Sequence, residues 1–229
     1  MKKNKENKVH YFKLSDPYGD FTQEELDTIT QKKPAELNVF DFMCVFQGSL
    51  PAGTYSECKQ FLPYVYKYIE NSKEPGICDV CNNLIHWIKK NKTLLIQDGM
   101  YDNAIHSLVM IATNMLENFT ISEGYPENLS VVEDIIFTFN ALDDYDNLGD
   151  KILSDTLLPF SSYAQVAWTC YLLYDVIGYP GLYISPFLMS LKNDDLMRKQ
   201  MFNLLVEYSY NDDSQLNFWN DIFVQIGLF

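Results

Sequence analysis

Four helix-start signals, each followed by apolar residues at helical spacing, constrain this chain most strongly. In a capping box, a Ser or Thr side chain accepts from the backbone N–H three residues on, and a Glu or Gln there reaches back. The four boxes are Thr22 with Glu25, Thr54 with Glu57, Ser130 with Glu133, and Ser162 with Gln165. Apolar residues at offsets of three and four follow them, although the first helix is short. The pattern predicts amphipathic helices.

No segment shows sustained alternation of apolar and polar residues, and Pro and Gly fall between the stripes. The segment 39–46 is rich in β-formers and suits either a helix or a strand. Pro63 lies inside a stripe, so it should kink that helix or delay its start. We therefore expect an all-α fold of about nine or ten helices packed as antiparallel hairpins. Because no pattern recurs at a fixed period, a compact irregular bundle and a short solenoid both remain open.

The charges are distributed unevenly along the chain. Residues 1–100 hold 13 Lys and 13 acidic residues, whereas residues 101–229 hold 4 basic and 18 acidic residues and so carry the whole net charge of −14. No linker accompanies this change, which falls near the turn at 97–99. We expect a disordered basic tail over residues 1–8 and a single helical domain over residues 9–229, neutral to about residue 100 and strongly acidic beyond.

Composition excludes several classes of protein. A strongly negative field repels nucleic acid and anionic lipid and attracts basic surfaces, so we expect neither a nucleic-acid nor a membrane partner. The chain shows no secretory signal and no apolar run long enough to span a membrane, which favours a cytoplasmic location. Five cysteines at irregular spacing do not form a disulfide framework, so we expect reduced, mostly buried thiols.

Cys78 and Cys81 form a C-x-x-C pair with His86 five residues further on. A structural zinc site needs four converging ligands, and on one continuous helix His86 points away from the two cysteines. A redox C-x-x-C should follow a strand, and no strand is expected before this one. We interpret the pair as core cysteines on a helix from Ile77 to Lys90.

The acidic segment 143–150 partly resembles a calcium loop. With Asp144 at the first position, the fifth position is Leu148 and the twelfth is Asp155 where Glu is expected. A magnesium–diphosphate site is also disfavoured, because phosphate needs basic partners that this half of the chain lacks. We interpret the segment as an acidic turn after a helix, and we expect no metal and no cofactor.

No motif for catalysis or nucleotide binding is present, and the three histidines, His10, His86 and His106, are isolated in the sequence. A nucleophilic set assembled only in space remains open. The most distinctive loop is 47–53, which contains two glycines and a proline. It is either a tight connection between helices or a pocket or contact loop.

Aromatic residues flanked by carboxylates recur in the acidic half, at Tyr145, Tyr174, Tyr208 and Tyr210. Such anchors suit a basic protein partner, because interface hot spots favour Tyr and Trp and complementary charge speeds encounter. The same residues also suit an ordinary solvated acidic surface.

We therefore expect a non-enzymatic acidic module that binds a basic protein, most concretely an immunity or antitoxin-type inhibitor of a nuclease toxin. The predicted partner-binding residues are Asp143, Asp144, Tyr145, Asp146 and Asp150, with Asp212 and Asp213 in reserve. Two other functions remain open: an all-helical metal-dependent enzyme with Asp and His ligands, and a helical-repeat adaptor. The partner's identity and the oligomeric state are not encoded in these patterns.

Overall fold

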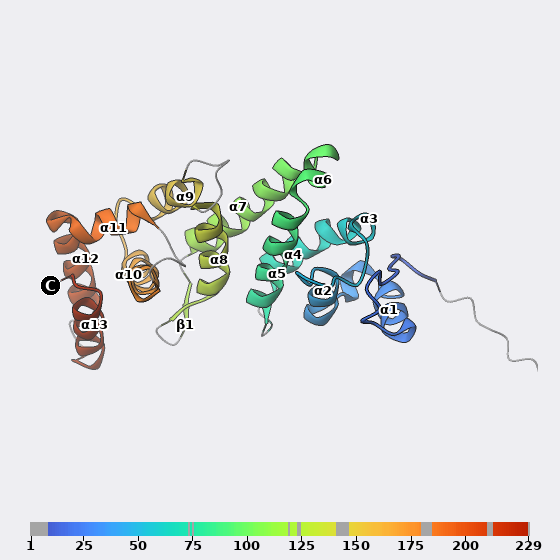
Figure 1. Ribbon diagram of the computed structural model, residues 1–229. Helices are drawn as coiled ribbons and strands as arrows, with labels where there is room; N and C mark the ends of the chain where they lie inside the picture. Colours follow the sequence, from blue (N-terminus) through green and yellow to red (C-terminus); the bar gives the residue numbers. More distant parts are fainter. Residues whose placement is uncertain are drawn as a thin grey trace, which may run out of the picture. The chain divides into compact units, whose positions relative to one another are not determined.

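The computed structural model describes residues 9–72, 74, 76–118, 120–122, 125–140, 147–179, 185–209 and 213–228 (Figure 1). Regular structure in this part of the chain is almost entirely helical, which confirms the all-α prediction. The side chains at 122, 125, 209 and 213–216 lie outside the description, and so does the expected basic tail, residues 1–8.

The contacts between residues divide the chain into Met1–Leu108, called unit 1, and Val109–Phe229, called unit 2. The boundary falls inside the helix α7 (Tyr101–Asn118). The expectation of one domain over residues 9–229 stays a prediction.

Unit 1 is built around α5 (Ile77–Lys90), which packs against α2 and α4. The apolar face of α5 is buried, and the ring of Trp87 lies between Phe46, at 5.4 Å, and Tyr55, at 5.6 Å between centroids. The remaining elements are α1 (Gln23–Thr30), the 3-10 turn η1 (Pro34–Glu36), α2 (Val39–Val45), α3 (Tyr55–Cys58), the 3-10 turn η2 (Lys59–Phe61), α4 (Leu62–Asn71) and α6 (Lys92–Gln97).

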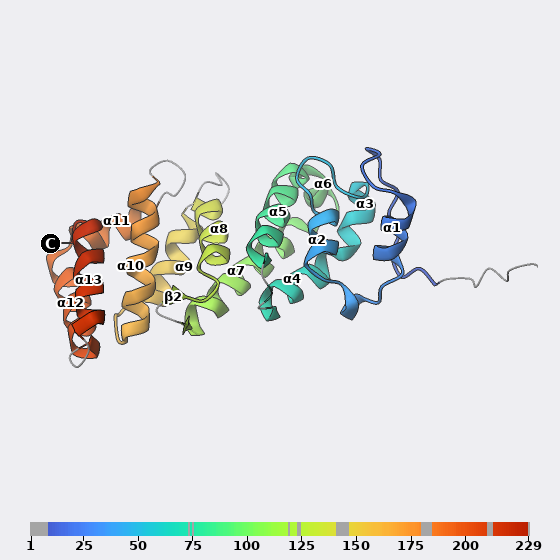
Figure 2. The same ribbon diagram turned by 90° about the horizontal axis from the view of Figure 1, so that it is seen from below.

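Unit 2 is built around α10 (Tyr163–Gly178). Every residue from Gln165 to Leu173 is buried, as expected for a helix surrounded by others. Figure 2 shows α10 between α8 and α9 on one side and α11, α12 and α13 on the other, and α10 contacts all five. The elements around it are β1 (Ile121–Ser122), β2 (Tyr125–Pro126), α8 (Leu129–Asn140), α9 (Leu148–Leu157), α11 (Pro186–Asn193), α12 (Asp195–Ser209) and α13 (Asp213–Gln225).

The described residues form more helices than the nine or ten expected, because short helices leave no periodic stripe in a sequence. The helix α3 has four residues and α6 has six. The ambiguous segment 39–46 forms α2, and Pro63 lies in the first turn of α4, so it delays the helix start instead of kinking the helix. A Pro costs little there, because the first backbone N–H groups of a helix have no partner within it.

Three of the four expected capping boxes are present, at Thr22, Thr54 and Ser162. A box that was not expected starts α2, where Asn38 Oδ1 accepts from the backbone N–H of Asp41 at 3.3 Å and Asp41 Oδ2 accepts from Asn38 N at 2.9 Å. The capping-box pattern of Ser or Thr followed by Glu or Gln does not include this box, because its first residue is Asn and its fourth is Asp.

The fourth expected box, Ser130 with Glu133, is wrong. The helix α8 begins at Leu129, and the backbone N–H groups of Val131 and Val132 donate to Asn128 O at 3.0 and 3.2 Å. Ser130 therefore lies within the first turn. Glu133 is turned into the protein interior, where 7% of it is exposed.

Candidate protein-binding surface

The negative charge of the chain belongs almost entirely to unit 2. Residues 1–108 contain 13 basic and 14 acidic residues, a net charge of −1, and residues 109–229 contain 4 basic and 17 acidic residues, a net charge of −13. One of the four cations, Arg198, is paired with Asp195. Unit 2 therefore carries a negative field that its own cations balance only slightly.

Most of the predicted partner-binding residues lie outside the described part of the chain. This applies to Asp143, Asp144, Tyr145, Asp146 and Asp212, and to the side chain of Asp213, the first residue of α13. Their role in binding stays a prediction.

Asp150, the remaining predicted residue, lies in α9 and is only 7% exposed. Its carboxylate accepts from Ser185 Oγ at 2.5 Å, Phe187 N at 2.8 Å and Asn140 Nδ2 at 2.9 Å. Ser185 also caps α11. Asp150 therefore joins α8, α9 and the start of α11, and its carboxylate is occupied within unit 2.

The calcium-loop resemblance does not hold for its described members. Gly149 stands at the sixth position, where a calcium loop makes its sharp turn, but it belongs to the helix α9. Among the described residues, no three His, Cys, Asp or Glu side chains are grouped as metal ligands would be.

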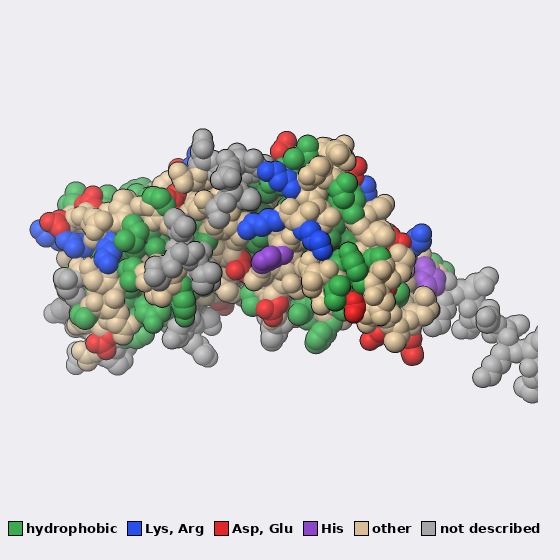
Figure 3. Space-filling model, viewed as in Figure 1, with side chains coloured by type: hydrophobic (Ala, Val, Ile, Leu, Met, Phe, Trp, Pro, Cys, Tyr) green, Lys and Arg blue, Asp and Glu red, His purple; other side chains and the backbone are tan. Residues whose placement is uncertain are grey.

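The exposed carboxylates of unit 2 are spread over several helices. The described ones are Glu117, Asp155, Asp194, Asp195, Glu207 and Asp221. On the face shown in Figure 3, the described acidic side chains of this unit lie apart from one another. The field of the described carboxylates therefore acts from several helices and at long range.

Two tyrosines expected at the surface, Tyr174 and Tyr208, are indeed exposed, at 42% and 59%. The Tyr208 ring stacks on Tyr163, with 3.8 Å between centroids. Tyr163 in turn meets the edge of Trp219 at 5.7 Å, and Trp219 contacts Phe218 at 5.1 Å. These rings join α10, α12 and α13 and hold Tyr208 against a rigid support.

Carboxylates lie close in sequence to the exposed members of this cluster. Glu207 directly precedes Tyr208 in α12. Asp221 follows Phe218 by three residues, so Asp221 and Phe218 share a face of α13. We call Tyr163, Tyr208, Phe218 and Asp221 the aromatic–acidic surface. An exposed ring beside a carboxylate is a setting that attracts Lys and Arg side chains.

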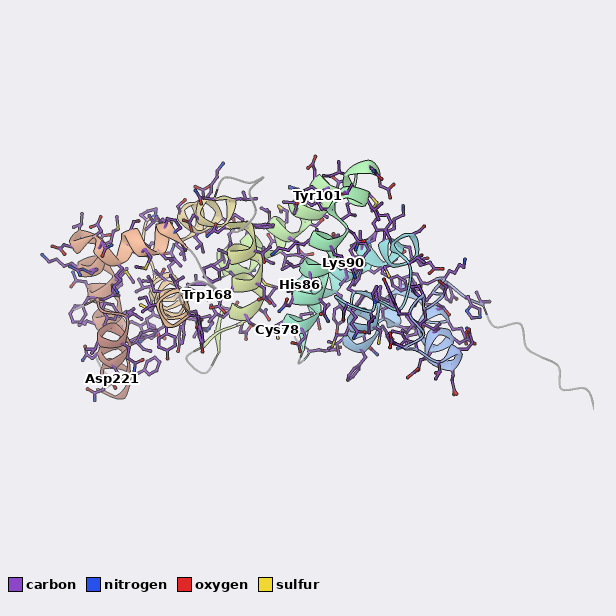
Figure 4. All side chains as sticks on the ribbon, in the orientation of Figure 1. Cys78, His86, Lys90, Tyr101, Trp168 and Asp221 are labelled. Atoms are coloured by element: carbon purple, nitrogen blue, oxygen red, sulfur yellow. The ribbon has the colours of Figure 1, made fainter. Side chains whose placement is uncertain are left out.

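The helix α5 carries Cys78, Cys81 and His86. Figure 4 shows Cys78 and His86 on this helix. Cys81 is buried and Cys78 is half-buried, and all five cysteines of the chain are free thiols. His86 Nδ1 lies 2.8 Å from the carbonyl oxygen of Asn82, so this nitrogen donates. The cysteines are therefore part of a helix, as expected, and His86 is bound within its own helix.

The loop 47–53 is anchored to the core at its second half. The backbone N–H of Ala52 donates to Cys44 O at 3.0 Å, and Ala52 O accepts from Asp16 N at 3.1 Å. A Cβ at Gly53 would lie 2.8 Å from Leu14 Cδ2, so only glycine fits here without a shift. This half is the tight connection that the sequence pattern allowed.

The first half of the loop lines an open hollow of about 630 Å³ against α5. Its walls include Gln47, Ser49, Asn82 and His86. Lys90 Nζ holds the loop there by donating to Gly48 O at 3.2 Å and Ser49 O at 3.4 Å. The loop is therefore a connection whose first half borders a hollow, and a role in binding stays a prediction.

Comparison of the chain with protein-family models, with curated proteins and with solved structures found no match. Within the described residues, no helix is long and apolar enough to cross a membrane.

Proposed function

We propose that unit 2 is a binding module for a basic protein, most concretely an immunity or antitoxin-type inhibitor that covers a basic nuclease toxin. The observation that supports this is the net charge of −13 on residues 109–229, in a unit that also exposes a rigid aromatic cluster. The negative charge speeds the encounter with a cationic surface, and the aromatic cluster supplies specific contacts once the partner has arrived.

The two components have separable effects. Dispersed carboxylates raise the association rate with a cationic protein and lose this effect as salt screens them. Tyr208 is large, exposed and held by Tyr163, so its burial against a partner costs little side-chain entropy and slows dissociation. The charge of the unit therefore sets the association rate, and the aromatic–acidic surface sets the dissociation rate.

The test measures association and dissociation rates with a purified basic nuclease-type protein encoded beside this chain's gene, at low and high salt. Tyr208→Ala should raise the dissociation rate about tenfold or more. Asp221→Asn should lower the association rate at low salt and have little effect at high salt.

Matched controls come from unit 1, where Tyr18 is 51% exposed and Asp20 is exposed. Tyr18→Ala and Asp20→Asn remove equivalent groups and should leave both rates unchanged. If no neighbouring basic protein binds, or if the unit 1 variants weaken binding as much as the unit 2 variants do, the proposal is wrong.

A further inference from the structure

Two cysteines near the start of α5 form a pair that the function proposed for unit 2 does not use. Gly76 is the N-cap of α5, so Cys78 is the second residue of the helix and lies in its first turn. Cys81 follows three residues later on the same helix. Cys78 is half-buried and Cys81 is buried, and neither takes part in a disulfide in the structure. The pair therefore places a thiol that a small reagent can reach beside one that the core of unit 1 encloses.

The helix brings the two thiols almost within bonding distance. Residues three apart on an α-helix share a face, and their Cα atoms lie about 5 Å apart. Disulfides join residues whose Cα atoms are about 4.4–6.8 Å apart. The Cβ atoms of a helical pair lie about 5–6 Å apart, whereas a disulfide needs about 3.5–4.5 Å. Bond formation therefore requires the helix to tighten between Cys78 and Cys81, by about 1–2 Å at the Cβ atoms.

The start of a helix is where such tightening costs least, because its first backbone N–H groups have no partner within the helix. In α5 the first helical bond runs from Val80 N to Gly76 O at 3.2 Å, so the N–H of Cys78 lies before this ladder begins. The chain also enters the helix through a tight turn, in which Ile77 N donates to Glu74 O at 3.3 Å. Tight turns with bonds between residues three apart are common at helix ends. The first turn of α5 can therefore adjust without breaking the rest of the helix.

A metal site and a catalytic redox site both fit this pair less well. Among the described residues, no third His, Cys, Asp or Glu side chain is grouped with the two cysteines as a metal ligand would be, and a structural zinc ion takes four ligands. A redox enzyme of the C-x-x-C type places a strand before its helix, whereas the described element before α5 is the helix α4. A bond between the two cysteines themselves is the chemistry that their placement favours.

We propose that Cys78 and Cys81 form a reversible disulfide on reaction with a low-molecular-weight disulfide of the glutathione type. The Cys78 thiolate attacks one sulfur of the oxidant, which forms a mixed disulfide and releases one glutathione thiolate. The Cys81 thiolate then attacks the Cys78 sulfur and displaces the second glutathione thiolate. Two cysteines are oxidised, one oxidant molecule is reduced to two thiols, and the two cysteine protons end on these thiols. The site lies in unit 1 and is independent of the function proposed for unit 2.

The test incubates the full chain with mixtures of oxidised and reduced glutathione and then alkylates the remaining thiols with iodoacetamide in urea. Trypsin releases residues 74–89 as one peptide that holds both cysteines. At about a hundredfold excess of oxidised over reduced glutathione, mass spectrometry should show most of this peptide without alkylation and lacking two hydrogens. Treatment with dithiothreitol should restore alkylation at both positions.

Two variants separate the steps of the reaction. Cys81→Ala should stop it at the mixed disulfide, so that glutathione accumulates on Cys78 in this variant and not in the parent. Cys78→Ala should leave Cys81 fully alkylated, because burial keeps the oxidant from Cys81. Circular dichroism checks that both variants are folded.

Cys44→Ala is the matched control, because Cys44 is half-buried like Cys78 but lies on α2. It should form the disulfide as the parent does. The proposal is overturned if the peptide stays fully alkylated at every glutathione ratio, or if the parent stops at the mixed disulfide. Pairing of Cys78 with Cys44, or with a second copy of the chain, would overturn it as well.

Discussion

Asn140 and Asp150 exchange two hydrogen bonds across the α8–α9 pair. Asn140 Nδ2 donates to Asp150 Oδ1 at 2.9 Å, and the backbone N–H of Asp150 donates to Asn140 Oδ1 at 2.9 Å. The first is the last residue of α8, and the second lies in the first turn of α9. Since Ser185 and Phe187 also donate to Asp150, this carboxylate connects three helices of unit 2.

Asp150→Ala should lower the free energy of unfolding by about 3 kcal/mol, because it leaves buried donors at Asn140, Ser185 and Phe187 without an acceptor. Asp150→Asn keeps one acceptor oxygen and should cost about half as much. Asp155→Ala, an exposed change on the same helix, should stay within about 0.5 kcal/mol of the parent. Urea denaturation followed by circular dichroism measures all three, and an unaltered midpoint for Asp150→Ala would contradict a structural role.

Gly149→Ala should also destabilise unit 2. A Cβ at this position would overlap the carbonyl oxygen of Ile136 and the side chain of Asn140, so α8 and α9 have to separate. Overpacking of this kind costs about 1–3 kcal/mol. Gly178→Ala is the control, since nothing lies within 4 Å of a Cβ there, and it should leave stability unchanged or raise it slightly. Thermal unfolding that ranks the two variants the other way would refute the close approach.

The capping boxes show which contacts of the fold depend only on residues that are close together in the sequence. Thr22 and Ser162 each bond to a residue in the first turn of the helix they cap, so sequence spacing predicts these caps. Glu133 has the same spacing to Ser130, but it faces Asp175 of α10, 42 positions further along the chain. Sequence spacing cannot identify this partner, because it depends on how α8 and α10 pack.

The candidate binding surface also has features that the sequence predicts and features that it does not. Exposure of Tyr174 and Tyr208 follows from their place beside acidic residues, and it was predicted. The burial of Asp150 was not, because a run of carboxylates normally lies in solvent and its donors Ser185 and Phe187 are distant in sequence.

The pair Glu133–Asp175 should make stability depend on pH. Burial raises the pKa of Glu133 well above its usual range, and the hydrogen bond to Asp175 and the charges of Asp175 and Asp134 raise it further. The native state therefore keeps a proton that the unfolded state loses above about pH 4.5. Stability from this group is complete below that pH and falls as the pH rises toward the native pKa.

Glu133→Gln mimics the protonated form and can still donate to Asp175, so it should remove this dependence. The stability of the variant relative to the parent should rise with pH above about pH 5, by at most about 1.4 kcal/mol per pH unit. Urea titrations at pH 5, 6, 7 and 8 measure the difference. Glu117→Gln, at an exposed position of α7, should show no such trend, and a flat difference for Glu133→Gln would disprove the shared proton.

The five cysteines should differ in how fast they react with a thiol reagent. Burial raises the pKa of Cys58 to about 12 and also raises the pKa of Cys170, so neither forms a reactive thiolate near neutral pH. Cys44 is half-buried, and burial together with Asp41 raises its pKa. Native protein should therefore react with a maleimide first at Cys78 and more slowly at Cys44, whereas Cys58, Cys81 and Cys170 should react only after unfolding. Peptide mass spectrometry of timed reactions gives the order, which fast labelling of Cys58 or Cys170 would contradict.

The acidic segment at 143–146 provides the most direct test of charge steering. The triple variant Asp143→Asn, Asp144→Asn, Asp146→Asn leaves Asp150 unchanged, and circular dichroism checks that the variant is folded. We expect about a tenfold lower association rate with the neighbouring basic protein at low salt. The difference should nearly vanish at high salt, because salt screens long-range attraction between charges. The control removes three exposed carboxylates of unit 1, Asp20→Asn, Glu24→Gln and Asp79→Asn, and changes the net charge by the same amount. Equal losses in the two triple variants would mean that only the total charge of the chain matters, and this segment would then have no special part in docking.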